Sequence, residues 1–206
     1  MEALLSTLTR GGPIVGVLIV ISLFSLTLIV MKLLQFRGTL SGDRQREAAY
    51  ALWSRGDRVG AMKAVEGGGS PVDRMLLAAM SGLRAGHQGG ALDTELEWRG
   101  NSEVEVLSRH IRTLELIAMI SPLLGLLGTV LGMIHAFQEL ALAEGAANAS
   151  LLAAGIWQAL LTTAAGLVVA IPAAIAASLF ASRVDRITTA MERAVGRLIA
   201  VDRQRH

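Results

Sequence analysis

The sequence contains no cysteine, which excludes disulfide bonds, thiolate nucleophiles and thiolate metal sites. Aromatic residues make up only 4% of the chain and charged residues only 17%. The motifs HExxH and GxSxG and the phosphate-binding loop are absent as well. The only lysines are Lys32 and Lys63, and no nucleophile stands at a recognisable spacing from a base. We therefore expect no enzyme activity, no metal site and no bound cofactor.

The chain is instead rich in hydrophobic residues, which make up 52% of its 206 positions. A membrane-spanning helix needs about 20 apolar residues, and three uncharged runs reach that length, at 11–31, 116–138 and 145–182. The first run continues into MKLLQFRG without a cleavage motif, so we interpret it as a retained helix and not as a signal peptide. The sequence thus predicts an all-α membrane protein with three transmembrane helices.

Basic residues predict the orientation of these helices. The connection at 139–148 has two glutamates and no lysine or arginine, whereas the other helix ends are flanked by basic residues. These are Lys32, Arg37, Arg44, Arg46, Arg99, Arg109, Arg112, Arg183, Arg186, Arg193 and Arg197. Because basic residues favour the cytoplasmic side, the amino terminus is expected outside and the carboxy terminus inside. The same residues suit anionic phospholipid, so the net charge of +2 gives no reason to expect nucleic acid.

Breaks in the pattern divide the chain into segments. They are an interfacial segment at 1–12, a first transmembrane helix at 13–34, a cytoplasmic helical region at 35–114, a second transmembrane helix at 115–139, an outer loop at 140–149, a third transmembrane helix at 150–182 and a cytoplasmic carboxy-terminal helix at 183–206. In the cytoplasmic region we expect helices at about 44–65 and 71–83, and a helix from about 93 that continues unbroken into the membrane. The third helix is expected to continue to about 201. The first helix is apolar on every side and is expected to face lipid.

The second and third runs each carry a threonine beside small residues. Thr129 shares a helix stripe with Pro122, Gly125, Gly132 and Ala136, and Thr163 shares one with Ala159, Gly166 and Ala170. A polar group without a partner in hydrocarbon is costly, so these stripes suggest a packed or hydrated interior. Both threonines are expected about 15–20 Å below the outer helix ends. The small stripes would leave room for a foreign helix.

Two motifs resemble those of a known family. SPLLGLLGTVLGM at 121–133 and GIWQALLTTAAGLVVAIPA at 155–173 are similar to the MotA/TolQ/ExbB family, with the ExbB branch closest and the TolQ branch second. The resemblance implies a homopentameric channel in the bacterial inner membrane. It also implies a single-span partner like ExbD or TolR with an essential aspartate, which uses the proton motive force to energise a TonB-like or TolA-like protein.

The resemblance also implies roles for particular residues. Thr129 and Thr163 would be pore hydroxyls facing the partner's carboxylate, and Gln158 and Thr162 would lie along the proton pathway. Gln158 stands where the familiar motif GIAEALLAT has glutamate, so the partner's aspartate would have to be the titrating carboxyl of the pathway. For Thr162 we favour a packing role. The glycines expected to pack helices in the pore are Gly125, Gly128, Gly132 and Gly166.

Three further residues are open to two interpretations each. His135 is the only ionisable side chain inside a spanning run, which makes it a candidate functional residue. It also lies one turn before Glu139 near the end of that run, where a hydrated His-Glu pair needs no functional explanation. Pro122 and Pro172 are either hinges of the pore helices or tolerated kinks. The threonines themselves have an alternative role, because threonine in membrane helices often bonds to its own backbone.

The function also has alternatives. One is a TolQ-like role in envelope constriction in place of nutrient uptake, and another is a scaffold that positions the partner without conducting. The sequence leaves the cargo, the stoichiometry and the choice between protons and sodium open.

Overall fold

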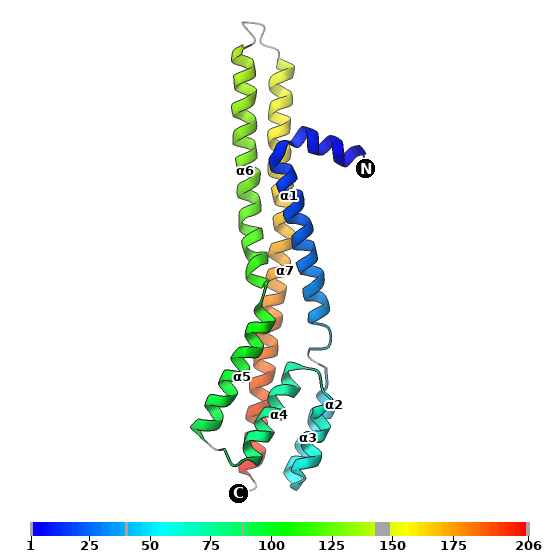
Figure 1. Ribbon diagram of the computed structural model, residues 1–206, viewed down its shortest axis with the longest axis vertical. Coiled ribbons are helices and arrows are strands. Elements are labelled where there is room, and N and C mark those ends of the chain that lie inside the picture. Colours follow the sequence, from blue (N-terminus) through cyan, green and yellow to red (C-terminus); the bar gives the residue numbers. More distant parts are fainter. Residues whose placement is uncertain (1, 40, 88, 143–148, 205–206) are drawn as a thin grey trace. The chain divides into compact units, whose positions relative to one another are not determined.

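The structure is a computed structural model that describes residues 2–39, 41–87, 89–142 and 149–204. Within these ranges it is entirely helical and contains no strand. The helices are α1 (Glu2–Gln35), α2 (Asp43–Arg55), α3 (Arg58–Glu66), α4 (Pro71–Arg84), α5 (Gly90–Ser108), α6 (Ile111–Leu142) and α7 (Ala149–Arg203) (Figure 1). The expectation of an all-α fold is confirmed for the described residues.

Three helical stretches among the described residues are long and apolar enough to cross a membrane. They are Gly12–Gln35, Gly90–Ala141 and Leu152–Arg203. The second and third extend well beyond the apolar runs, because α5 and the second half of α7 carry charged residues. The chain is therefore a multi-pass membrane protein whose later helices continue outside the bilayer.

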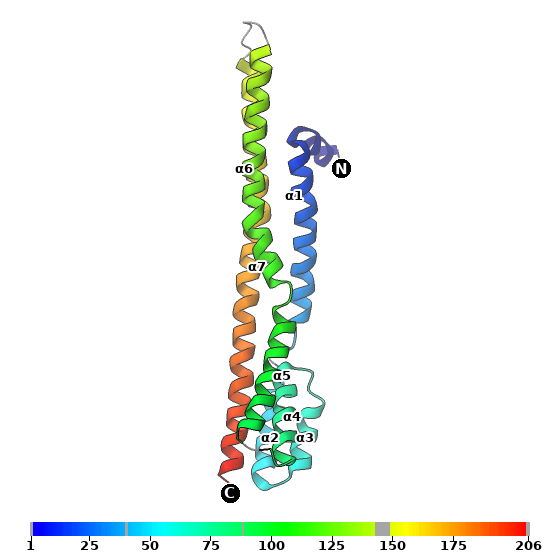
Figure 2. The ribbon, with the colours of Figure 1, turned by 60° about the vertical axis from the view of Figure 1, so that its left-hand side comes forward.

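The chain divides into two compact units, Met1–Met31 with His110–Leu179 and Lys32–Arg109 with Phe180–His206. The first unit, here called the membrane unit, holds most of α1, all of α6 and the first part of α7. In it, α6 and α7 lie side by side and antiparallel in Figure 1, and in Figure 2 α6 lies in front of α7. The second, here called the cytoplasmic unit after the location that the sequence predicts for it, holds α2 to α5 and the second part of α7.

The first transmembrane helix is preceded by a sharp kink. Gly12 has φ 68° and ψ −176°, a conformation open to glycine, and Pro13 follows it. From there α1 buries one stripe that includes Val15, Leu18 and Leu28 and exposes large apolar side chains elsewhere, such as Val20. An exposed apolar surface of this kind suits contact with lipid, as the sequence predicts.

The expected helix at 44–65 is wrong, because the structure divides it into α2 and α3. Gly56 adopts a left-handed conformation with φ 91° and ends α2. Asp57 then caps α3 by accepting a hydrogen bond from the Gly60 N–H at 2.8 Å. Gly56 therefore ends one helix and Asp57 begins the next. The helical spacing of the apolar residues continues across this break and does not reveal it.

The expectation of one unbroken helix from about 93 into the membrane is also wrong. α5 ends at Ser108 and α6 begins at Ile111, with His110 at φ 69° between them. No glycine or proline marks this break. Instead Lys32 Nζ donates to the Leu107 carbonyl at 2.8 Å, and Gln35 Nε2 reaches the Val106 carbonyl at 3.5 Å. The last carbonyls of α5 are therefore satisfied by side chains of α1 and need no further helical turn.

The third transmembrane helix continues as α7 from Ala149 to Arg203 without interruption at Pro172. Polar contacts hold α2 against its second part in the cytoplasmic unit. Tyr50 Oη donates to the Ala194 carbonyl at 3.1 Å, and Trp53 Nε1 donates to Asp202 Oδ1 at 2.9 Å. Of the outer loop expected at 140–149, residues 143–148 lie outside the described residues.

Candidate functional site

The two motif-bearing helices form a close seam built from their glycines. A Cβ placed on Gly166 would lie 2.6 Å from the Ser121 carbonyl oxygen, and one on Gly125 would lie 2.9 Å from the Thr162 carbonyl oxygen. Cβ atoms essentially never approach so closely, so only glycine allows α6 and α7 to come this near. Gly132 follows the same seam against Ala159, at 3.2 Å.

This packing corrects the expectation that the small stripes leave room for a foreign helix. The space beside Gly125, Gly132 and Gly166 is filled by the other helix of the same chain. Gly128 belongs to the same seam, since a Cβ there would lie 2.5 Å from the Thr162 hydroxyl. A partner helix would therefore have to approach another face of α6 or α7.

Thr162 lies inside the seam, with 3% of its surface exposed. Its hydroxyl is 2.7 Å from the Ala159 carbonyl oxygen and 3.1 Å from the Gly125 carbonyl oxygen across the seam. The donor is thus shared between its own helix and α6, which holds the two together. Its position agrees with a packing role and not with a place on a proton pathway.

Thr129 and Thr163 lie at the flanks of the seam. The Thr163 hydroxyl donates to the Gly125 carbonyl at a long 3.3 Å, and its side chain is half-buried. The Thr129 hydroxyl donates to its own helix at the Leu126 carbonyl, at 2.7 Å. Both hydroxyl oxygens keep lone pairs that can accept a hydrogen bond from a protonated carboxyl. The Thr163 hydroxyl lies at the level of the Gly125 carbonyl, and Gly125 is four residues, or about 6 Å along α6, from Thr129. The two hydroxyls therefore differ in depth by about 6 Å.

An open groove begins at Thr129 on the carboxy-terminal half of α6, with a volume of about 600 Å³. Its lining is apolar except for Thr129 and Gln138. The remaining lining residues are Val130, Met133, Ile134, Phe137 and Ala141. The groove can therefore receive an apolar helix that brings a single polar group to the depth of Thr129.

Gln158 is separated from the two threonines. It lies five residues before Thr163, about 140° around α7, and its side chain is exposed. A Cβ on Gly12 would lie 4.0 Å from Gln158 Nε2, which places the amide beside the kink of α1. The structure does not bring Gln158 together with Thr129 or Thr163.

The remaining candidates are placed as follows. His135 Nε2 lies 3.6 Å from Glu139 Oε1, and both side chains are exposed near the carboxy-terminal end of α6. Pro122 and Pro172 lie inside continuous helices. No group of three histidine, aspartate or glutamate side chains in the part of the chain that the structure describes is close enough to hold a metal ion.

One feature that the sequence analysis missed lies in the cytoplasmic unit. Arg186, Arg193 and Arg197 were explained as topology determinants, but their spacing of seven and four residues places them on one face of α7. In the structure they line a single groove between α2 and α7. Their helical spacing was the signal available in the sequence.

Comparison with known proteins identifies the family. The sequence profile of the MotA/TolQ/ExbB proton channel family matches residues 68–193. The chain is 48% identical over 82 residues to biopolymer transport protein exbB1 of Vibrio cholerae, a match that covers 40% of this chain and 36% of that protein. It is 38% identical over 122 residues to the putative biopolymer transport protein ExbB-like 3 of Synechocystis, covering 57% and 58% of the two.

A third relative is the Tol-Pal system protein TolQ of Haemophilus influenzae, 44% identical over 89 residues, which are 42% of this chain and 38% of that protein. The matched stretches thus span between about a third and somewhat more than half of these relatives. The profile match covers more than half of this chain. The chain belongs to the MotA/TolQ/ExbB proton channel family.

Proposed function

We propose that this protein is an ExbB-like channel subunit of the bacterial inner membrane that works as a homopentamer. With a single-span partner like ExbD, it uses the proton motive force to energise a TonB-like protein for transport at the outer membrane. Family membership and the relatives named as biopolymer transport proteins support this proposal. The flanking basic residues support a periplasmic amino terminus and a cytoplasmic carboxy terminus.

The observation that carries the channel proposal is the position of Thr129 and Thr163. Both hydroxyls lie at the edge of the α6–α7 seam, and neither is enclosed in it as Thr162 is. The partner's helix would lie along the groove that begins at Thr129 and bring its aspartate to that depth. Each hydroxyl can accept a hydrogen bond from the neutral carboxyl while it donates to its backbone carbonyl. By rotating away from that carbonyl it can instead donate to the ionised carboxylate, so it stabilises both states of a proton carrier.

The partner's aspartate would then be the titrating group of the pathway. Gln158 cannot hold a charge, and it lies beside Gly12 on another side of α7 from Thr163. We therefore assign the pathway to the two flanking threonines, and we assign Thr162 and Gln158 to helix contacts within the subunit.

The test is a double substitution, Thr129→Val with Thr163→Val. Valine keeps the shape of threonine and removes the hydroxyl, so we expect assembly with the partner to persist and energised transport to be abolished. Thr27→Val is the matched control, because Thr27 is exposed on α1 and bonds only to its own helix at the Leu23 carbonyl. Full transport in the double variant would refute the pore assignment.

Each of two alternative functions is supported by one observation. The similarity to a TolQ favours a role in envelope constriction, and the identity of the partner encoded next to this gene separates that role from nutrient uptake. The glutamine at position 158 favours a scaffold that conducts nothing. Proton flux into liposomes, measured with and without the partner, distinguishes a scaffold from a channel.

A further inference from the structure

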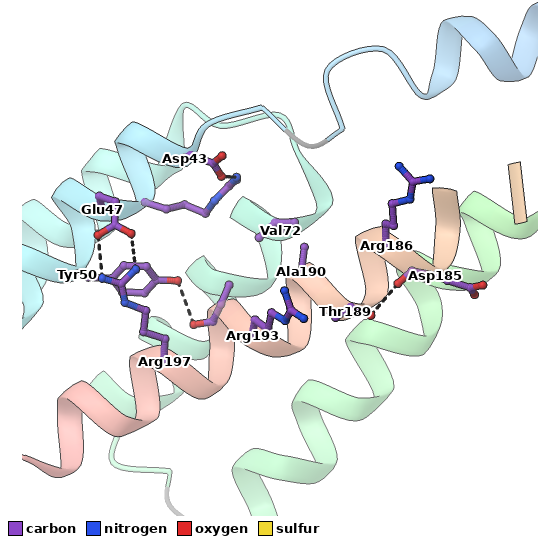
Figure 3. Close-up of a pocket in the computed structure, with 12 residues that line it drawn as sticks. Asp43, Glu47, Tyr50, Val72, Asp185, Arg186, Thr189, Ala190, Arg193 and Arg197 are labelled. Atoms are coloured by element: carbon purple, nitrogen blue, oxygen red, sulfur yellow. Dashed lines mark hydrogen bonds and ion pairs between the residues drawn. The ribbon is translucent and has the colours of Figure 1, made fainter. Parts of the chain in front are cut away.

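The groove lined by Arg186, Arg193 and Arg197, here called the arginine groove, has charges that are only partly neutralised within the chain. It lies between α2 and α7 in the cytoplasmic unit, has a volume of about 580 Å³ and has an apolar floor that includes Val72, Ala190 and Ala194 (Figure 3). We propose that it receives the exposed acidic face of α5 from a second copy of this chain. This inference rests on the ring assembly proposed above and specifies which faces of neighbouring subunits meet.

Two of the groove's arginines already have partners. Arg197 makes a bidentate pair with Glu47, and its Nη2 donates to Glu47 Oε2 at 2.8 Å. The hydrogen bond from Arg197 lowers the pKa of Glu47, so this carboxylate stays ionised and occupied. Arg46 donates to Asp73 at 2.7 Å and also pairs with Asp43.

The other two arginines are different. Arg186 and Arg193 form no ion pair with any residue that the structure describes, and no interaction is drawn to either of them in Figure 3. Asp185 also lines the groove, so one exposed carboxylate stands against these two guanidinium groups. One positive charge is therefore left over at the Arg186 and Arg193 end of the groove, whereas Arg46 at the other end is paired with two carboxylates.

The exposed face of α5 has the complementary character. Asp93, Glu97 and Glu105 are exposed and form no ion pair within the described residues, and Trp98 is 71% exposed among them. Asp93 and Glu97 stand at the edge of this face, where they also line the groove between α5 and α7 of the same chain. By contrast the acids on the other faces of α5 are neutralised, Glu95 by Arg99 and Glu103 by Arg74. An exposed tryptophan between acidic residues is typical of an interface anchor, and it can also stack on arginine.

The depths of the two surfaces agree. In the cytoplasmic unit α5 and α7 run antiparallel (Figure 1), and residues 93–104 of α5 line a second groove with residues 188–199 of α7. Continuing this register puts Glu105 near the level of Arg186, and Glu97 near the level of Arg193. In a ring whose axis runs along this part of α7 all copies share the same levels, so these levels hold between neighbours.

The two surfaces also point in different directions, as a closed ring requires. Val195 lines the groove that α5 shares with α7 in the same chain, and it lies about 180° around the helix from Arg186. Each copy therefore presents α5 on one side of α7 and the arginine groove on the other. Such a head-to-tail contact uses two different patches and can close into a ring.

The absence of native cysteine makes a disulfide test direct. One chain carries Glu105→Cys and a second, size-tagged chain carries Arg186→Cys, and the two are produced together with the partner in native membranes. We expect a covalent heterodimer after mild oxidation, and the same from Glu97→Cys with Arg193→Cys. The matched controls exchange the partners: Glu105→Cys with Arg193→Cys and Glu97→Cys with Arg186→Cys differ in depth by about 10 Å and should lose the crosslink.

Charge reversal gives a second readout. Glu97→Arg and Arg193→Glu are each expected to weaken ring assembly about tenfold, and the double variant is expected to recover it, as contacting residues do in a double-mutant cycle. Equal crosslinking in matched and exchanged pairs within an intact ring would overturn the docking contact alone. A monomeric mass for the native complex would overturn the ring and the contact together. Absent crosslinks combined with loss of phosphatidylglycerol from the Arg186→Glu variant would identify lipid as the occupant and also overturn the contact.

Discussion

At the scale of single residues, the glycines of α6 and α7 have a packing role that is specific to position. A methyl group on Gly166 would meet the Ser121 carbonyl, a backbone group that cannot rotate away. A methyl group on Gly196 of the same helix would have no atom within 4 Å. Two glycines of one helix therefore differ completely in what an added side chain would contact.

Gly166→Ala is expected to lower the free energy of unfolding by about 1–3 kcal/mol, the usual cost of overpacking. Gly196→Ala is the matched control and should raise it by about 0.5–1 kcal/mol, because alanine favours the helix. Thermal unfolding of the detergent-solubilised protein measures both. Equal effects of the two substitutions would contradict the seam.

At the scale of elements, the break between α5 and α6 depends on a side chain far away in the sequence. Lys32 is 1% exposed, and its amino group donates both to the Leu107 carbonyl and to Gln35 Oε1 at 2.7 Å. The amino group also lies over the Phe36 ring, which in turn stacks on Phe180 of α7. The end of α5 is thus held by α1.

Lys32→Met keeps the apolar stem and removes the donor. We expect it to destabilise the end of α5 by about 1–3 kcal/mol, because a buried carbonyl loses its partner. Hydrogen exchange of the amides at 106–110 should accelerate. Gln35→Ala is the comparison, because it removes the long 3.5 Å contact with Val106 and one acceptor of Lys32 but leaves the bond from Lys32 to the Leu107 carbonyl, so it should have a smaller effect. Faster exchange in Gln35→Ala than in Lys32→Met would contradict the cap.

At the scale of the whole molecule, the chain passes between its two units three times, after Met31, after Arg109 and after Leu179. Each passage lies at or near one end of an apolar run. The units therefore correspond to two solvents, the hydrocarbon of the bilayer and the aqueous phase beside its basic flanks.

The proposed orientation predicts opposite labelling of two single-cysteine variants. Ala141→Cys should react with a membrane-impermeant maleimide in spheroplasts, and Gln204→Cys should react only after the membrane is lysed. Labelling of both after lysis is the control for reactivity. The reverse pattern in intact spheroplasts would contradict the orientation.

Much of the fold could be predicted because its signals are local. Uncharged runs predict the three spans, and two short motifs predict the family, which the profile match confirms. The two wrong helix predictions have the same cause. Neither the Gly56-Asp57 break nor the α5–α6 break interrupts the apolar period, and the second is set by Lys32, which is far away in the sequence.

For the candidate site the division is similar. The sequence by itself determined that Thr129 and Thr163 lie on small-residue stripes, because helical spacing is a property of neighbouring residues. Only the tertiary structure decided which helix fills those stripes: the chain's own α6 and α7 close on each other, enclose Thr162 and leave Thr129 and Thr163 at the flanks. A stripe of small residues determines how closely another helix can approach. Which helix approaches depends on packing between segments that are distant in sequence.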